Sequence, residues 1–191
     1  MIRRAVAALA LLALAGAAGA QGIETDGDAL GPVEAGVFCT EKTGGRIAAP
    51  GTVSGFVDLV GEVELVARTL VVPAAPGLTF GYRAAALADA PGAVQILAHP
   101  PFPGHGATEQ TTAAPLRRGA TRLGLYSFDH DYERVTGPWT FEIRHEGEAI
   151  LRVRFRAVPP EAAPHLVGLC EGPPPISQAP PLSPRAPAGS G

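Results

Sequence analysis

The chain has 191 residues, and 15 Lys and Arg stand against 18 Asp and Glu, so the formal net charge is −3. Surfaces that bind nucleic acid or anionic membranes are strongly basic, and this charge balance argues against both kinds of partner. Gly and Pro contribute 24 and 20 residues, a composition that discourages long helices and favours short strands joined by turns.

The first 20 residues have the three parts of a secretory signal peptide. Arg3-Arg4 forms the positive start, Ala5 to Ala15 is an unbroken apolar run, and Ala18-Gly19-Ala20 has the small-x-small pattern that signal peptidase reads. We therefore predict cleavage between Ala20 and Gln21 and export to the periplasm or the cell exterior. The alternative, an uncleaved membrane anchor, is weaker because the run is shorter than the roughly 18 residues that span a bilayer. Cleavage leaves 13 Lys and Arg against 18 Asp and Glu, a net charge of about −5.

Two segments with little to bury flank the predicted folded region. Residues 21–32 are polar and Gly-rich, and we expect them to form a flexible leader. Residues 172–191 contain seven prolines and are predicted to be disordered, as a spacer or, alternatively, as a polyproline ligand. The folded domain is predicted to span residues 33–171.

The region between these segments has the pattern of successive short strands, each bounded by Gly, Pro or Asp. Strands are predicted over residues 33–39, 52–60, 63–72, 78–83, 94–99, 122–128, 139–145 and 149–158, and residues 108–113 are the candidate for one more. Residues 84–90 (AAALADA) favour a single helical turn. This pattern predicts an all-β, antiparallel two-sheet sandwich, immunoglobulin-like in the broad sense, with a small β-barrel as the alternative.

The last two predicted strands form the clearest hairpin of the sequence. Apolar residues alternate with polar ones along both strands, so each strand has one apolar face. For these faces to coincide, the loop needs an odd number of residues, and His145-Glu146-Gly147 provides three. The resulting register pairs Phe141 with Leu151, Trp139 with Val153, and Arg144 with Glu148.

Cys39 and Cys170 lie near the two ends of the predicted domain. An even pair of cysteines in an exported protein is typical of a disulfide, and we predict that these two are bonded. Such a bond would close a loop of more than 100 residues and, on the chain-entropy account, stabilise the fold by roughly 4–5 kcal/mol. The alternative is two free thiols; the absence of a CxxC motif argues against a redox centre.

Four segments resemble a known family. Val37-Phe38-Cys39, Tyr126-Ser127-Phe128-Asp129, Val135 to Glu142, and Phe155 to Pro160 are similar to the bacterial secreted proteins grouped as domain of unknown function 3859. The resemblance covers about residues 33–170, and its most specific part is Pro138-Trp139-Thr140-Phe141-Glu142. It implies an exported globular domain and carries over no catalytic residue.

Candidate metal ligands occur in two loops. His99 and His105 flank a rigid Pro-rich run and could face one metal ion, but no third ligand is evident. Asp129 and Asp131 alternate in an acidic loop that could bind calcium, but the remaining ligands of a calcium loop are absent. We therefore predict no cofactor, and exposed or turn-capping roles for these side chains.

A row of arginines, Arg152, Arg154 and Arg156, is the best candidate for a binding surface. The row lies on the polar face of the last strand, where it could meet an acidic protein or a carboxylated glycan. The alternative is an ordinary solvated strand face whose charges deter aggregation.

Nothing in the sequence assembles a catalytic centre. Ser54 and Ser127 are the serines of the core region, and neither lies in a Gly-x-Ser-x-Gly elbow. We predict an exported, monomeric, non-catalytic binding module whose partner is an unidentified envelope protein or glycan. The alternatives are a structural or assembly component that acts through a sheet edge and, less favoured, a hydrolase or metal-dependent enzyme with a loop-built site.

Overall fold

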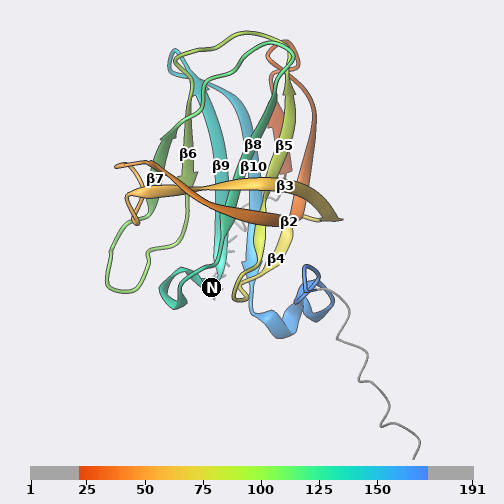
Figure 1. Ribbon diagram of the computed structural model, residues 1–191, viewed down its shortest axis with the longest axis vertical. Coiled ribbons are helices and arrows are strands. Elements are labelled where there is room, and N and C mark those ends of the chain that lie inside the picture. The colour runs from red at the N-terminus through yellow and green to blue at the C-terminus, as the bar shows by residue number, and fades with distance from the viewer. Residues whose placement is uncertain (1–21, 172–191) are drawn as a thin grey trace, which may run out of the picture.

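The computed structural model describes residues 22–171, which form two packed β-sheets (Figure 1). One sheet has the order β1 (Gly22–Thr25), β10 (Glu148–Val158), β9 (Gly137–His145), β6 (Val94–Ala98), β7 (Glu109–Ala113), and β4 (Val71–Pro73) also pairs with β10. The other has the order β3 (Phe56–Arg68), β2 (Leu30–Ala48), β5 (Thr79–Ala86), β8 (Thr121–Ser127). Short 3-10 turns follow at η1 (Asp131–Glu133), η2 (Pro160–Ala162) and η3 (Pro164–Leu166).

This arrangement confirms the predicted two-sheet sandwich, immunoglobulin-like in the broad sense, and the β-barrel alternative is wrong because the strands form two separate sheets. All strand pairs are antiparallel except β4 with β10, a parallel pair three residues long. The additional strand predicted over residues 108–113 is present as β7.

A cluster of aromatic side chains joins the two sheets. Phe80 of β5 is fully buried, and its ring centroid lies 5.6 Å from Trp139, 5.7 Å from Phe141 and 5.2 Å from Phe155. These edge-to-face contacts fall in the separation range that aromatic pairs prefer. The alternation seen in the sequence thus places the apolar faces of β9 and β10 inside the sandwich, as predicted.

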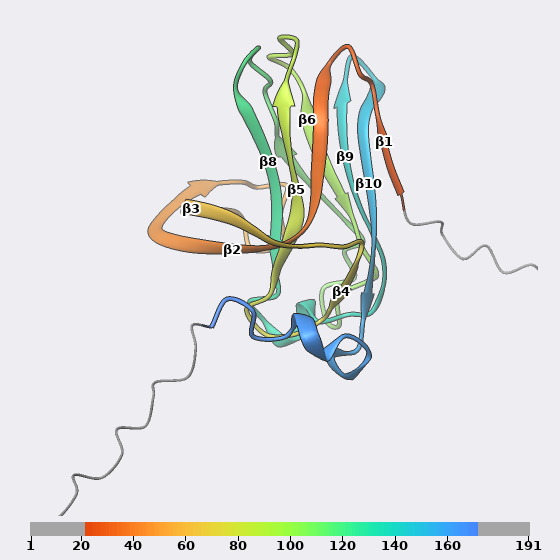
Figure 2. The same cartoon turned by 90° about the vertical axis from the view of Figure 1, so that its right-hand side faces the viewer.

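Strands β2 and β3 continue as a hairpin past the end of the β2–β5 pairing. β2 pairs with β5 only as far as Phe38 and then continues to Ala48 with β3 as its partner. Figure 2 shows this part of the hairpin projecting away from the two sheets. We call residues 39–64 the β2–β3 arm. The predicted break at Gly61-Glu62 is wrong, because a register shift between the pairs Thr40–Val63 and Lys42–Val60 takes up these residues within a continuous strand.

Two further sequence-based expectations need correction. The predicted flexible leader over residues 21–32 contains β1, which pairs with β10 from Gly22 to Thr25, and the first residues of β2. β1 forms from mostly polar residues because it lies at the edge of its sheet. Residues 84–86 belong to β5 rather than to a helical turn, because buried Ala84 and Ala86 pack in the core and tertiary contacts override helix propensity. The predicted signal peptide, its cleavage site and the Pro-rich tail lie outside the described residues.

The β9–β10 hairpin has a different register from the predicted one. Its turn contains two residues, Glu146 and Gly147, with φ of 51° and 87°, and His145 pairs with Glu148. A bulge between Ala149 and Leu151 then restores the match of the apolar faces. The observed pairs are Phe141 with Val153, Ile143 with Leu151, Trp139 with Phe155, and Arg144 with Ala149. The prediction of a three-residue loop is therefore wrong, and so are the predicted pairs Phe141–Leu151, Trp139–Val153 and Arg144–Glu148. The extra residue that brings the two apolar faces together lies in the bulge of β10 and not in the loop.

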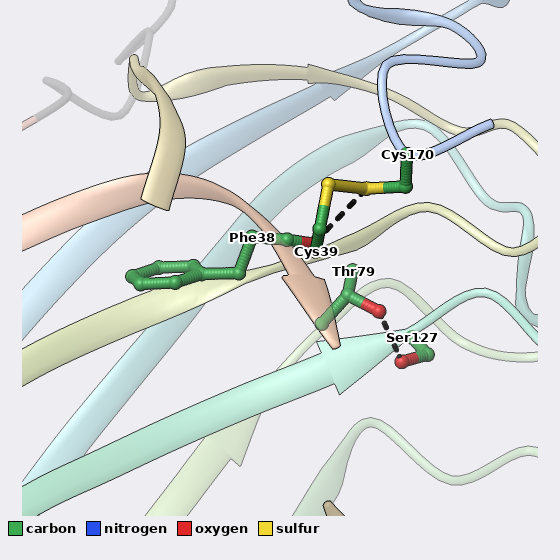
Figure 3. The surroundings of a disulfide bond; sticks show 5 residues. All are labelled: Phe38, Cys39, Thr79, Ser127 and Cys170. Atoms are coloured by element: carbon green, nitrogen blue, oxygen red, sulfur yellow. Dashed lines mark hydrogen bonds between the residues drawn. A yellow bond between two sulfur atoms is a disulfide. The ribbon is translucent and has the colours of Figure 1, made fainter. Parts of the chain in front are cut away.

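Cys39 and Cys170 form the predicted disulfide, which joins residues 131 positions apart (Figure 3). The bond lies where β2 leaves the sandwich: Phe38 is fully buried, and its carbonyl oxygen lies 3.6 Å from the Cys170 Sγ. Beside it, the hydroxyl groups of Thr79 and Ser127 are hydrogen-bonded at 2.6 Å between β5 and β8. The bond therefore ties the end of the described chain to the root of the arm.

The left-handed conformation of Glu146 generates a stability prediction. A residue with a side chain is disfavoured at positive φ, and Asn is the preferred residue at this position of a two-residue turn followed by Gly. We expect Glu146→Asn to raise the free energy of unfolding by about 0.5–1 kcal/mol, as judged by urea denaturation. Glu148→Asn, in the strand just beyond the turn, serves as the control and should give no gain. A loss of stability in Glu146→Asn would contradict the observed turn.

Candidate functional site

The two histidines considered as metal ligands have separate surroundings. The His99 side chain is buried and stacks on Phe102, with ring centroids 3.9 Å apart. Its Nδ1 donates to the Pro100 carbonyl oxygen at 2.8 Å, so that its Nε2 accepts from the Gln110 amide at 3.3 Å. Burial lowers the pKa of His99, which keeps the ring neutral. His105 is exposed and lies against Tyr132 instead, with ring centroids 4.4 Å apart.

The acidic loop after β8 is occupied by ion pairs within the protein. Asp129 accepts from Lys42 at 2.7 Å, and Asp131 accepts from Arg134 at 2.5 Å. Ser127, close to both in sequence, bonds to Thr79. Within residues 22–171, no group of three or more His, Cys, Asp and Glu side chains is placed to hold a metal ion. The structure therefore does not bring the sequence candidates together into one site.

The predicted arginine row lies on the outer face of its sheet, where a charge network engages Arg152 and Arg154. Glu24 of β1 accepts from Arg152 at 3.0 Å and from Arg154 at 2.5 Å. Glu142 of β9 accepts from Arg152 at 2.7 Å and also pairs with Arg144. Arg156 stands outside these ion pairs. Two glutamates thus serve three arginines, Arg144, Arg152 and Arg154, so the row is partly neutralised.

The pKa values of these carboxyl groups reflect the same network. Burial raises the pKa of Glu142, but hydrogen bonds from Arg144 and Arg152 outweigh it, and the net pKa is lowered. Hydrogen bonds from Arg154 and Arg152 lower the pKa of Glu24. Both carboxyl groups are therefore ionised at neutral pH and hold their arginines in place.

The strongest surface feature, which the sequence analysis missed, is an apolar patch on the β2–β3 arm. Ile47, Val57 and Leu59 are 56%, 43% and 42% exposed, and Phe56 nearby is 51% exposed. Ile47 and Val57 are cross-strand neighbours, and Leu59 lies two positions along β3, so these three share one face. We call Ile47, Val57 and Leu59 the arm patch. Gly45 keeps Leu59 close to the arm, since a Cβ there would lie 2.8 Å from the Leu59 Cδ1.

Contacts near its root and at its tip hold the arm in position. Lys42 bridges Asp58 on the arm, at 3.5 Å, and Asp129 after β8, at 2.7 Å. At the tip, the Gly51 carbonyl oxygen accepts from the Thr111 N–H of β7 at 2.9 Å. Figure 1 shows the arm crossing the molecule toward β7. The arm patch is therefore presented by a fixed element of the fold.

A hollow of about 400 Å³ lies at the end of the sandwich that carries the β9–β10 turn. Its lining includes four carboxylates and His145, from residues far apart in the sequence: Asp26, Asp89, Glu146 and Glu148. Two of these carboxylates already accept backbone N–H groups, Asp26 from Asp28 and Asp89 from Arg118, both at 2.9 Å. The hollow is therefore an open end of the sandwich, where two of the four carboxylates are engaged in hydrogen bonds within the protein. Across residues 22–171, no helix is long and apolar enough to cross a membrane.

Fold and surface together define the class: an immunoglobulin-like β-sandwich with a projecting hairpin arm. The chain belongs to the family described as "Domain of unknown function (DUF3859)", whose model matches residues 28–157. This result confirms the family resemblance derived from the sequence segments. The search of curated proteins found no match. Among solved structures, the chain is similar to an immunoglobulin-like protein from Pseudomonas aeruginosa, with 23% sequence identity, coverage of 73% of this chain and 100% of that chain, and a TM-score of 0.49.

The charge network around Glu142 yields a prediction about acid stability. Because its folded-state pKa is lowered from 4.5, ionised Glu142 stabilises the fold above that value, and this contribution is lost as the pH falls through the lowered pKa. We expect Glu142→Gln to lower the free energy of unfolding at pH 7 by about 1–2 kcal/mol and to reduce the loss of stability between roughly pH 5 and pH 3.

Urea denaturation at a series of pH values measures both effects. Glu148→Gln is the control, because Glu148 is exposed and outside the ion pairs of the described residues; its variant should stay within about 0.5 kcal/mol of the parent. An acid dependence of Glu142→Gln equal to that of the parent would show that the network does not act in solution.

Proposed function

We propose that the protein is exported, has no catalytic role and acts as a protein-interaction module whose binding element is the β2–β3 arm. One observation carries this proposal: the exposed apolar side chains of the arm patch are gathered on an element that the rest of the fold holds in place. Single exposed apolar residues are ordinary, whereas a group of them on one surface is typical of a contact with another macromolecule.

The chemistry of the arm favours a protein as the partner. Aliphatic side chains such as Val57 and Leu59 gain free energy by leaving water for an apolar surface, and they offer nothing to the hydroxyl groups of a glycan. The arginine row, the earlier candidate for binding, is partly neutralised by Glu24 and Glu142. We therefore place the interaction on the arm rather than on the outer face of β10.

Two features support the proposed export. The sequence of residues 1–20 has the pattern of a cleavable signal, and the bonded pair Cys39–Cys170 suits an oxidising compartment. The proposed absence of catalysis agrees with the engagement of His99, Asp129 and Ser127 in contacts that leave them unconnected with one another.

Site-specific crosslinking in the producing cell tests the role of the arm. A photoreactive phenylalanine analogue at position 57 is expected to give a discrete adduct of higher mass with one protein, because Val57 lies in the arm patch. The matched position is Leu87, an apolar residue of the sandwich body that is 41% exposed, and it should give no such adduct. The double substitution Ile47→Ser and Leu59→Ser should reduce the adduct at position 57 by at least fivefold. Equal labelling from positions 57 and 87 would refute the arm as the binding element.

Fractionation and mass spectrometry test export. The protein recovered outside the cytoplasm is expected to begin at Gln21 and to contain no titratable thiol, since Cys39 and Cys170 are bonded. Ala20→Leu should block processing and accumulate the full-length precursor, whereas Ala17→Leu, outside the small-x-small positions, should be processed. Recovery of an unprocessed parent chain from the cytoplasm would contradict the proposal.

A further inference from the structure

We propose that the outer edge of β3 binds an extended segment of a partner protein that carries alternating basic and apolar residues, so that the segment becomes an additional strand of the β3-β2-β5-β8 sheet. This inference rests on the proposed function, because β3 forms half of the arm, and it adds the mode of binding and the chemistry of the partner.

One edge of β3 is open. β3 lies at the end of its sheet and, among the described residues, pairs with β2 alone. It is 13 residues long, about 40 Å at roughly 3.3 Å per residue, and contains neither Pro nor Lys, two devices that protect edge strands from pairing. An unpaired row of backbone N–H and C=O groups, interrupted by the register shifts at Gly61-Glu62 and Val66, is a template for strand addition.

The other edges of the described fold are shorter or partly occupied. β8 has seven residues, β1 four and β4 three. β7 has five residues, and its Thr111 N–H already donates to the Gly51 carbonyl oxygen at the arm tip. β3 is therefore the edge with the greatest capacity for main-chain hydrogen bonds.

The arm also carries unpaired negative charge. Glu41, Glu62 and Glu64 are exposed and form no ion pair with the described residues. The cations of the arm are already engaged, since Lys42 pairs with Asp58 and Asp129, and Arg46 pairs with Asp58 at 2.9 Å. The edge of β3 is consequently acidic, and lysines or arginines at alternate positions of an added strand would pair with it.

The arm patch continues this surface toward the tip. Val57 and Leu59 are exposed on β3 itself, so apolar residues of an added strand would lie beside them on the same face. An occupant that complements both parts combines basic residues near Glu62 and Glu64 with apolar residues near Val57 and Leu59.

Two occupants within the protein itself fit this surface poorly. Antiparallel pairing of β3 with the β3 of a second copy, centred on Gly61, would set Glu64 opposite Asp58 of that copy, and like charges across a strand pair are destabilising. The C-terminal residues 172–191 contain seven prolines, which lack the N–H groups that a strand ladder requires. The charge and the open ladder therefore favour a basic segment from another protein.

Peptide binding followed by hydrogen–deuterium exchange tests the proposal on the full mature chain. The probe is a capped peptide of sequence KVTVKVTVK; its comparison peptides are the acidic EVTVEVTVE and the ladder-breaking KVTPKPTVK. We expect the basic probe alone to bind, to slow exchange of β3 backbone amides at least tenfold, and to bind less tightly as salt is raised. No binding of the basic probe, or protection confined to another edge such as β8, would overturn the proposal.

Charge reversal provides the matched variants. Glu62→Lys with Glu64→Lys should weaken binding of the basic probe at least fivefold and allow the acidic peptide to bind, while Glu146→Lys with Glu148→Lys, with the same spacing at the β9–β10 turn, should leave binding unchanged. Equal weakening in both double variants would contradict recognition at β3. A position-57 adduct that persists in cells while the basic probe fails to bind would overturn strand addition alone; loss of the adduct as well would remove the proposed function too.

Discussion

The packing of Phe80 between the sheets is the contact on which the rest of the structure depends. Its ring lies 5.2–6.1 Å from five other aromatic rings: Tyr126, Phe128, Trp139, Phe141 and Phe155. These rings come from three strands and the loop after β8, so one buried side chain sets the position of β5 relative to the opposite sheet. The next residue, Gly81, meets the partner strand without a side chain, since a Cβ there would lie 1.9 Å from the Gly124 carbonyl oxygen. β5 is thereby held tightly by its neighbours on the sheet and across it.

The arm follows from where β5 begins. β2 pairs with β5 as far as the Phe38–Thr79 pair, and beyond it β2 has only β3 as a partner, so the two strands leave the sandwich together. The Cys39–Cys170 bond, the Lys42–Asp129 ion pair and the Gly51–Thr111 hydrogen bond hold the hairpin at its root, along its length and at its tip. A surface held in this way loses little conformational entropy when a partner binds, which is the condition for useful affinity from a small apolar patch.

The alternation of apolar and polar residues was sufficient to predict the class of fold and the inward faces of β9 and β10, because side-chain direction in a strand depends only on local geometry. The alternation did not determine the register of the β9–β10 hairpin. The two apolar faces coincide either with an odd-length loop or with a two-residue turn followed by a bulge. The chain has the second arrangement, with Glu146 in the turn and the bulge beginning at Ala149. The arm could not be foreseen for a related reason. Val57 and Leu59 have the same pattern as core residues, and only the tertiary arrangement shows that they remain 43% and 42% exposed.

In the candidate site, too, local sequence predicts the direction of a side chain but not its contacts with residues far away in the chain. The outward direction of Arg152 and Arg154 follows from alternation, but their neutralisation depends on Glu24, which lies 128 and 130 positions away in sequence. Arg152 and Arg154 on the outer face of this sheet are therefore paired within the protein, whereas Glu62 and Glu64 on β3 have no such partner among the described residues. Unpaired carboxylates beside exposed aliphatic side chains deter β3 from pairing with a second copy and are complemented by a partner of opposite charge. That contrast between the two sheets is the physical reason to expect recognition on the arm.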